Sequence, residues 1–177
     1  SYLATSDAAI AAIARDEAAM LRVLAAAVRD RGVAIDEISV GATPTARVSL
    51  QQEGITELRP GNYVYFDRTQ VGLGAAALAD CAPTVLATVV AKPAPDRLIL
   101  DCGSKTLSSD PPRGAGSPAG FGLVFSDLDG TAPAPNLTTV RLSEGRAGRQ
   151  APGGTAPLAP AERGRALPTP TARAATL

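Results

Sequence analysis

The chain lacks histidine altogether and has only two lysines, Lys92 and Lys105, among its 177 residues. Without histidine, this chain has no histidine-based proton transfer near neutral pH and no histidine ligand for a metal. Cysteine is almost as scarce: Cys81 and Cys102 are the only two, and their spacing matches no metal-binding or redox motif. We therefore expect buried free thiols in a cytoplasmic protein.

An excess of charge is missing too, because 17 basic and 17 acidic residues give a formal net charge of +0. This balance argues against nucleic acid or an anionic membrane as the main partner. No apolar run is long enough to span a bilayer. Four charged residues among the N-terminal alanines argue against a secretory signal: Asp7, Arg15, Asp16 and Glu17.

The first part of the chain has an α/β pattern. Residues 6–31 are expected to form a helix that is capped by Ser6 or Asp7 and stopped by Gly32. The apolar residues at helical spacing are Ile10, Ile13, Met20, Leu21, Leu24 and Val28. Residues 34–40 then read as a strand, and a helix followed by a strand across a tight glycine turn predicts a parallel sheet.

The segment after this strand is expected to form a short crossover that leads into a second strand. Residues 45–52 are predicted to form a helical turn, and residues 55–58 a short extended piece. Arg59-Pro60-Gly61-Asn62 has the composition of a turn. The aromatic and β-branched run 63–66 then reads as a strand whose side chains alternate between two faces.

Antiparallel strands are expected further on. Residues 84–91 and 97–101 predict a hairpin with a loop at 92–96. Two further short strands are predicted at 121–125 and 137–142. This change from an α/β pattern to a series of antiparallel strands indicates a domain boundary near residues 75–83.

The end of the chain has a different composition. Ala, Gly, Pro and Arg make up 24 of the 33 residues from 145 to 177, and Val, Ile, Phe and Tyr are absent. Such a segment buries too little apolar surface to offset its ordering entropy, so we expect disorder. The predicted division is therefore 1–80, an α/β part; 81–144, an incomplete β domain; and 145–177, a disordered tail.

The turn Gly41-Ala42-Thr43-Pro44-Thr45 is the first candidate site. It places backbone N–H groups and two hydroxyls at the carboxyl edge of a parallel sheet, where ligands of α/β folds bind. A phosphate fits such a turn, because Gly41 allows close approach to the backbone. The alternative is a plain loop capped by Thr43. Gly61 and Asn62 strengthen the phosphate hypothesis, since they would lie on the neighbouring strand's loop.

These turns and several later segments resemble the D-threonine aldolase and D-serine dehydratase family. The matching stretches are Ser1-Tyr2, Gly41–Thr45, Thr56–Val64, Val85–Val90, Leu100–Ser108 and Leu142–Glu144. The resemblance covers roughly residues 1–144. It implies the C-terminal part of an alanine-racemase-like (β/α)8 barrel in residues 1–80, followed by a β domain over residues 81–144.

The resemblance implies a pyridoxal-phosphate- and metal-dependent lyase that acts on D-β-hydroxy amino acids and that is commonly a homodimer when intact. Cofactor-phosphate contacts would come from the first turn, at Gly41, Ala42 and Thr43, although the family often has Ser where this chain has Ala42. The cofactor-binding residues carried over from the family are Tyr2, Gly41, Ala42, Thr43, Gly61 and Asn62.

The resemblance also implies missing parts. The family's Schiff-base lysine would lie before residue 1, and Lys105 falls in the β domain, so no catalytic residue is assigned. The family's divalent metal (Zn, or Mn/Mg) needs a His–x–Cys or His–x–Asp pair, and the matching region around 167–171 has none of these. We therefore expect a C-terminal fragment that is inactive alone.

The resemblance is expected to stop at Glu144, where a shift of reading frame would explain the Ala/Gly/Pro/Arg composition; a genuine low-complexity tail is the alternative. Three other functions stay open. They are a non-catalytic or split-partner module that binds pyridoxal phosphate, an amino-acid racemase of the same barrel type, and a small nucleotide-binding α/β protein.

Overall fold

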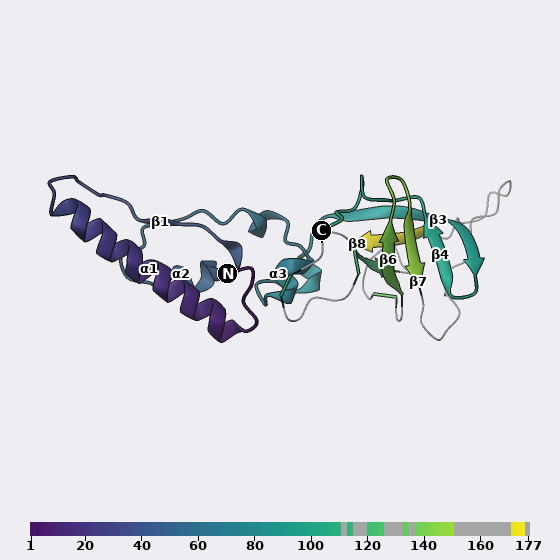
Figure 1. Ribbon diagram of the computed structural model, residues 1–177, viewed down its shortest axis with the longest axis horizontal. Coiled ribbons are helices and arrows are strands. Elements are labelled where there is room, and N and C mark those ends of the chain that lie inside the picture. The colour runs from purple at the N-terminus through teal and green to yellow at the C-terminus, as the bar shows by residue number, and fades with distance from the viewer. Residues whose placement is uncertain (111–112, 115–119, 126–132, 135–136, 151–170, 176–177) are drawn as a thin grey trace. The chain divides into compact units, whose positions relative to one another are not determined.

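The computed structural model describes residues 1–110, 113–114, 120–125, 133–134, 137–150 and 171–175. The chain divides into two compact units, one formed by Ser1–Ala77 with a return segment that begins at Arg113, and one that begins at Leu78. Helices dominate the first unit and strands the second (Figure 1). No helix in the described part of the chain has the length and apolar character needed to cross a membrane.

Helix α1 (Asp7–Arg29) confirms the predicted N-terminal helix. Ser6 Oγ accepts a hydrogen bond from the Ala9 amide at 3.2 Å, and Gly32 adopts a φ of 83° after the last turn. Both ends therefore form through the side chain and the glycine that the sequence supplies.

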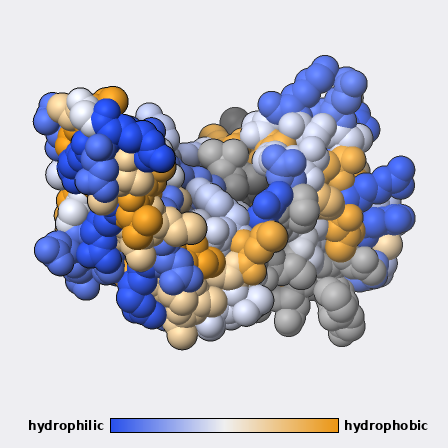
Figure 2. All heavy atoms as spheres, turned by 60° about the vertical axis from the view of Figure 1, so that its left-hand side comes forward, coloured by the Kyte–Doolittle hydropathy of each residue, from blue (hydrophilic) through white to orange (hydrophobic). Residues whose placement is uncertain are grey.

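The buried face of α1 differs from the predicted one. It is made largely of alanines, which allow close approach to α2 (Ala46–Ser49) and to the 3₁₀ turn η1 (Thr43–Thr45). Ile13, Met20 and Leu24 were expected to pack inward, but they are 38%, 67% and 59% exposed. In Figure 2, hydrophobic side chains accordingly gather in patches on the surface of the part that comes forward.

Strands β1 (Ser39–Val40) and β2 (Glu57–Leu58) form a parallel pair, with η1 and α2 between them. The second strand falls on the predicted extended piece 55–58 and not on the predicted strand 63–66. Ser39 lies opposite Glu57, and Val40 opposite Leu58. The first strand is shorter than the predicted span 34–40. At its start the Ile38 amide donates to Thr56 Oγ1 at 2.8 Å, so a side chain takes the place of a ladder partner.

The predicted strand at 63–66 is wrong. Asn62–Val64 forms the 3₁₀ turn η2, in which the Asn62 carbonyl accepts bonds from the amides of Tyr65 at 3.3 Å and Phe66 at 2.8 Å. Tyr63, Val64 and Tyr65 are all exposed, so the expected alternation of faces is absent. These local bonds satisfy the backbone without a neighbouring strand, and they override the strand propensity of the aromatic residues. Helix α3 (Arg68–Gly72) follows.

The second unit contains an antiparallel sheet of order β5-β8-β3-β4-β7-β6, preceded by the turn η3 (Leu78–Asp80). Its strands are β3 (Thr84–Ala94), β4 (Arg97–Leu100), β5 (Leu123–Phe125), β6 (Thr138–Leu142), β7 (Ala147–Gln150) and β8 (Thr171–Ala175). The predicted hairpin is confirmed, but β3 runs through Ala94 and leaves only Pro95 and Asp96 in the turn. The core contains Val89, Leu98 and Leu100, each 0% exposed.

Two stretches of the predicted disordered tail are strands. β7 pairs with β4 and β6, and β8 pairs with β3 and β5. Backbone hydrogen bonds, which any residue except proline can make, hold both stretches in the sheet, so the lack of large apolar residues does not prevent pairing. Gly145 and Arg146 precede β7, and the remaining residues of the predicted tail lie outside the described residues.

Neither cysteine forms a disulfide, as expected. Cys102 is buried in the core of the second unit, but Cys81 is partly exposed, so the prediction of burial holds for Cys102 only. The segment after Cys102 runs beside the β6–β7 connection, where the Ser104 amide donates to the Ser143 carbonyl at 2.8 Å.

Candidate functional site

The two candidate turns lie side by side because their strands are paired in parallel. The Arg59 amide donates to the Val40 carbonyl at 2.8 Å and extends the pairing beyond Leu58. A Cβ placed on Gly41 would lie 2.8 Å from the Arg59 carbonyl oxygen. Only glycine therefore lets the first turn approach the second this closely.

The first turn presents backbone N–H groups. Ala42 is extended, with φ of −154° and ψ of 130°, and its carbonyl accepts bonds from the Thr45 amide at 3.3 Å and Thr45 Oγ1 at 3.2 Å. Within the described residues, the amides of Gly41, Ala42 and Thr43 donate no hydrogen bond. Three neighbouring unpaired donors form a site that suits an anion.

The Thr43 hydroxyl is the polar group that most clearly indicates a ligand. Thr43 is 6% exposed, and its Oγ1 has no hydrogen-bond partner among the described residues. A buried hydroxyl left unpaired costs about 1–3 kcal/mol. A ligand that accepts or donates a hydrogen bond at this position would remove that cost.

The second turn has an open position at Gly61 and is held by a side-chain hydrogen bond from Asn62. A Cβ on Gly61 would meet no atom within 4 Å, so the protein itself leaves this position open. The Asn62 side chain is already engaged, because its Nδ2 donates to Asp67 Oδ2 at 2.5 Å. Asp67 in turn caps α3 by accepting from the Gln70 amide at 2.8 Å. The Asn62 side chain is thus engaged within the turn.

Tyr2 is the sixth predicted residue. It packs against Ile10 and Leu73, and its hydroxyl is 3.5 Å from Gln70 Nε2. Tyr2 makes no hydrogen bond to either turn in the described part of the chain. The structure places Gly41 against Arg59, next to the second turn, while cofactor binding by Tyr2, Gly41, Ala42, Thr43, Gly61 and Asn62 stays a prediction.

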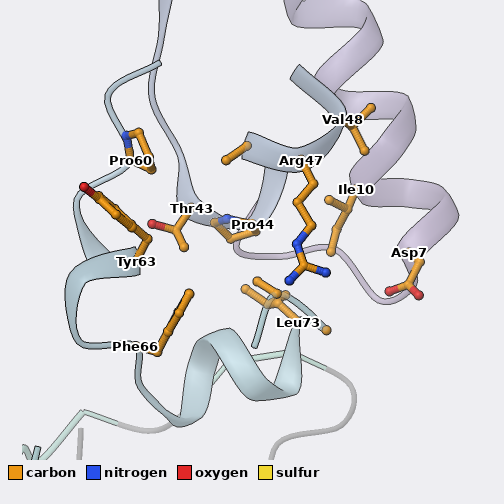
Figure 3. A pocket seen from close by; sticks show the side chains of 13 residues that line it. Asp7, Ile10, Thr43, Pro44, Arg47, Val48, Pro60, Tyr63, Phe66 and Leu73 are labelled. Atoms are coloured by element: carbon orange, nitrogen blue, oxygen red, sulfur yellow. The ribbon is translucent and has the colours of Figure 1, made fainter. Parts of the chain in front are cut away.

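A pocket of about 320 Å³ adjoins the turns (Figure 3). It shares Thr43, Pro44 and Pro60 with them, but Gly41 and Gly61 do not line it. Sequence reasoning missed the other residues of this pocket, which come from separate segments and show no common motif. They are Asp7, Ile10, Ala46, Arg47, Val48, Tyr63, Phe66, Leu73, Gly74 and Ala75.

Groups for acid–base or metal chemistry are scarce. Among the described residues no three His, Cys, Asp or Glu side chains gather as a metal site requires. Lys105 Nζ pairs with Glu144 Oε2 at 2.9 Å, and both side chains are exposed. Burial lowers the pKa of the Arg68 guanidinium from its usual range, since desolvation disfavours its charge.

Comparisons with known proteins agree on one family. The family described as "Putative serine dehydratase domain" matches residues 82–168, so the resemblance does not stop at Glu144 as expected. D-serine dehydratase of Dictyostelium discoideum is 34% identical over 120 residues, which are 63% of this chain and 30% of that protein. D-threonine aldolase of Arthrobacter sp. is 34% identical over 124 residues, 67% of this chain and 32% of that protein.

The fold agrees as well. The structure of D-threo-3-hydroxyaspartate dehydratase from Delftia sp. HT23 superposes with a TM-score of 0.81 at 30% identity. It covers 99% of this chain and 46% of that chain. The chain thus spans about a third of the length of the curated relatives and under half of this solved structure.

Proposed function

Because the chain belongs to the D-threonine aldolase and D-serine dehydratase family, we propose that it supplies the cofactor-phosphate turns and the β domain of a pyridoxal-phosphate-dependent lyase. The proposed substrates are D-β-hydroxy amino acids, the class named by the relatives. The proposal rests chiefly on one observation: the unpaired amides of the first turn lie next to a buried Thr43 hydroxyl that lacks a partner.

The residues present fit the phosphate of this cofactor. The amides of Gly41, Ala42 and Thr43 would donate to phosphate oxygens, and the Thr43 hydroxyl would add a fourth donor. The missing side chain at Gly61 leaves room for the phosphate beside the second turn. The chain would thereby hold and orient the cofactor, while bound pyridoxal phosphate supplies the electron sink for the reaction.

The residues present do not fit the family's metal. The chain has no histidine, and the described residues contain no cluster of metal ligands. We therefore derive no step through a metal. The first unit also contains no lysine, since Lys92 and Lys105 both belong to the second. We propose that the lysine and the bond-breaking groups come from chain outside these 177 residues.

Binding of pyridoxine 5′-phosphate tests the proposed turns, because this analogue lacks the aldehyde and cannot react with surface amines. We expect it to bind the chain, and unphosphorylated pyridoxine to bind at least about tenfold more weakly. Thr43→Val should lower the affinity for the analogue about tenfold, since one hydrogen-bond donor to a charged group is lost. Phosphorus NMR titration measures the affinity for the analogue, and amide NMR titration of the chain measures the affinity for pyridoxine.

Thr5→Val is the matched control, because Thr5 is exposed and contributes to neither turn. It should leave the affinity for the analogue within twofold of the parent chain. Equal affinity for pyridoxine and its phosphate would contradict the proposal. Displacement by ADP but not by pyridoxal phosphate would favour a nucleotide-binding protein instead.

A further inference from the structure

The pocket of about 320 Å³ contains two opposite charges that do not satisfy each other. Arg47 and Asp7 both line it, yet they form no ion pair, and neither side chain makes a hydrogen bond within the described residues. Figure 3 shows the Arg47 guanidinium reaching between Pro44 and Ile10 toward Leu73, with the Asp7 carboxylate at the edge of the same space. A cation and an anion are therefore presented to one pocket.

The remaining lining is mostly apolar. Ile10 and Leu73 are buried at 6% and 4% exposure, and Phe66 is partly buried. Pockets of this size that combine apolar walls with a few placed polar groups are typical of small-molecule sites. The unpartnered Thr43 hydroxyl, which is more than nine-tenths buried, adds one hydrogen-bonding group to the lining.

We propose that this pocket binds a zwitterionic amino acid with an apolar side chain. Its carboxylate would pair with Arg47, its ammonium group with Asp7, and its side chain would pack against Ile10, Phe66 and Leu73. A simple anion would face Asp7 unfavourably, and a simple cation would face Arg47 unfavourably, so only a zwitterion uses both charges. The site adjoins the cofactor-phosphate turns and shares Thr43 with them, but Gly41 and Gly61 do not line it.

Phenylalanine, tested as both enantiomers, is the probe, and amide NMR of the full chain is the measurement. At least one enantiomer should bind saturably in the low millimolar range and shift the amide signals of Arg47, Phe66 and Leu73. Arg47→Gln should lower the affinity for phenylalanine at least about tenfold. It should leave the affinity for phenylalaninamide, which has no carboxylate, within twofold of the parent chain. Asp7→Asn should lower the affinity for phenylalanine similarly. It should leave the affinity for N-acetylphenylalanine, which has no ammonium group, within twofold of the parent chain.

Arg15→Gln is the matched control, since it removes the same charge from an exposed position of α1 outside the pocket. It should not change phenylalanine binding. The proposal is overturned if neither enantiomer binds saturably. It is also overturned if Arg15→Gln and Arg47→Gln lower the affinity for phenylalanine equally. Pyridoxine 5′-phosphate binding separates the two proposals, because Arg47→Gln should leave that affinity unchanged even if the cofactor proposal succeeds and this one fails.

Discussion

Replacing Gly41 with alanine is expected to weaken pyridoxine 5′-phosphate binding by about thirtyfold or more. The new Cβ would lie 2.8 Å from the Arg59 carbonyl oxygen, which is closer than real Cβ contacts come. Because Arg59 is held to the Val40 carbonyl, the first turn must move away from the second. Two or more of the amide donors to the phosphate would then be misplaced, and each bond to a charged group is worth about 1.5–3 kcal/mol.

Two measurements separate this local effect from unfolding. Amide NMR should show the signals of α1 unchanged in Gly41→Ala, with shifts confined to residues near the two turns. Gly61→Ala should leave the thermal midpoint unchanged, since a Cβ there meets nothing within 4 Å, whereas Gly41→Ala should lower it. Full affinity for the phosphate analogue in a folded Gly41→Ala chain would show that the phosphate binds elsewhere.

The sequence predicts those parts of the fold whose signals are local. The cap at Ser6 and the left-handed Gly32 define α1, because each acts through bonds within a few residues of itself. The glycine turns were predicted for a similar reason: glycine at the end of a strand indicates a close backbone approach. The structure shows a close approach at Gly41, where a Cβ would lie 2.8 Å from the Arg59 carbonyl oxygen, but it is the second turn that approaches. The expected approach of a phosphate stays a prediction.

The sequence fails at one local turn and at elements whose partners lie far along the chain. The run 63–66 has strand propensity, but bonds to the Asn62 carbonyl and a φ of 50° at Phe66 hold it as a turn. Strand β8 pairs with β3 and β5, and strand β7 pairs with the distant β4 as well as with its neighbour β6, and local composition does not reveal the distant partners. The two charged residues that line the pocket were missed likewise, because Asp7 and Arg47 reach the same pocket only through the packing of α1 on α2.

Gly103→Ala is expected to have the largest effect on stability, lowering the free energy of unfolding of the second unit by about 3 kcal/mol. A Cβ on Gly103 would overlap the Ser143 carbonyl oxygen and the Arg146 amide nitrogen. These are backbone atoms in the turn between β6 and β7, so no side-chain rotation relieves the overlap. The Ser143 amide is itself bonded to the Arg146 carbonyl at 2.8 Å, which holds both atoms in place.

Gly145→Ala, in the same β6–β7 turn, is the control, because its Cβ would meet no atom within 4 Å. It should change the free energy of unfolding by no more than about 0.5 kcal/mol. Urea unfolding followed by circular dichroism measures both variants. Equal stabilities would show that the segment Gly103–Lys105 does not pack on the turn. A selective loss in Gly103→Ala would show that this contact, made by bonds from Ser104 to Ser143 and from Lys105 to Glu144, secures the edge strand β6.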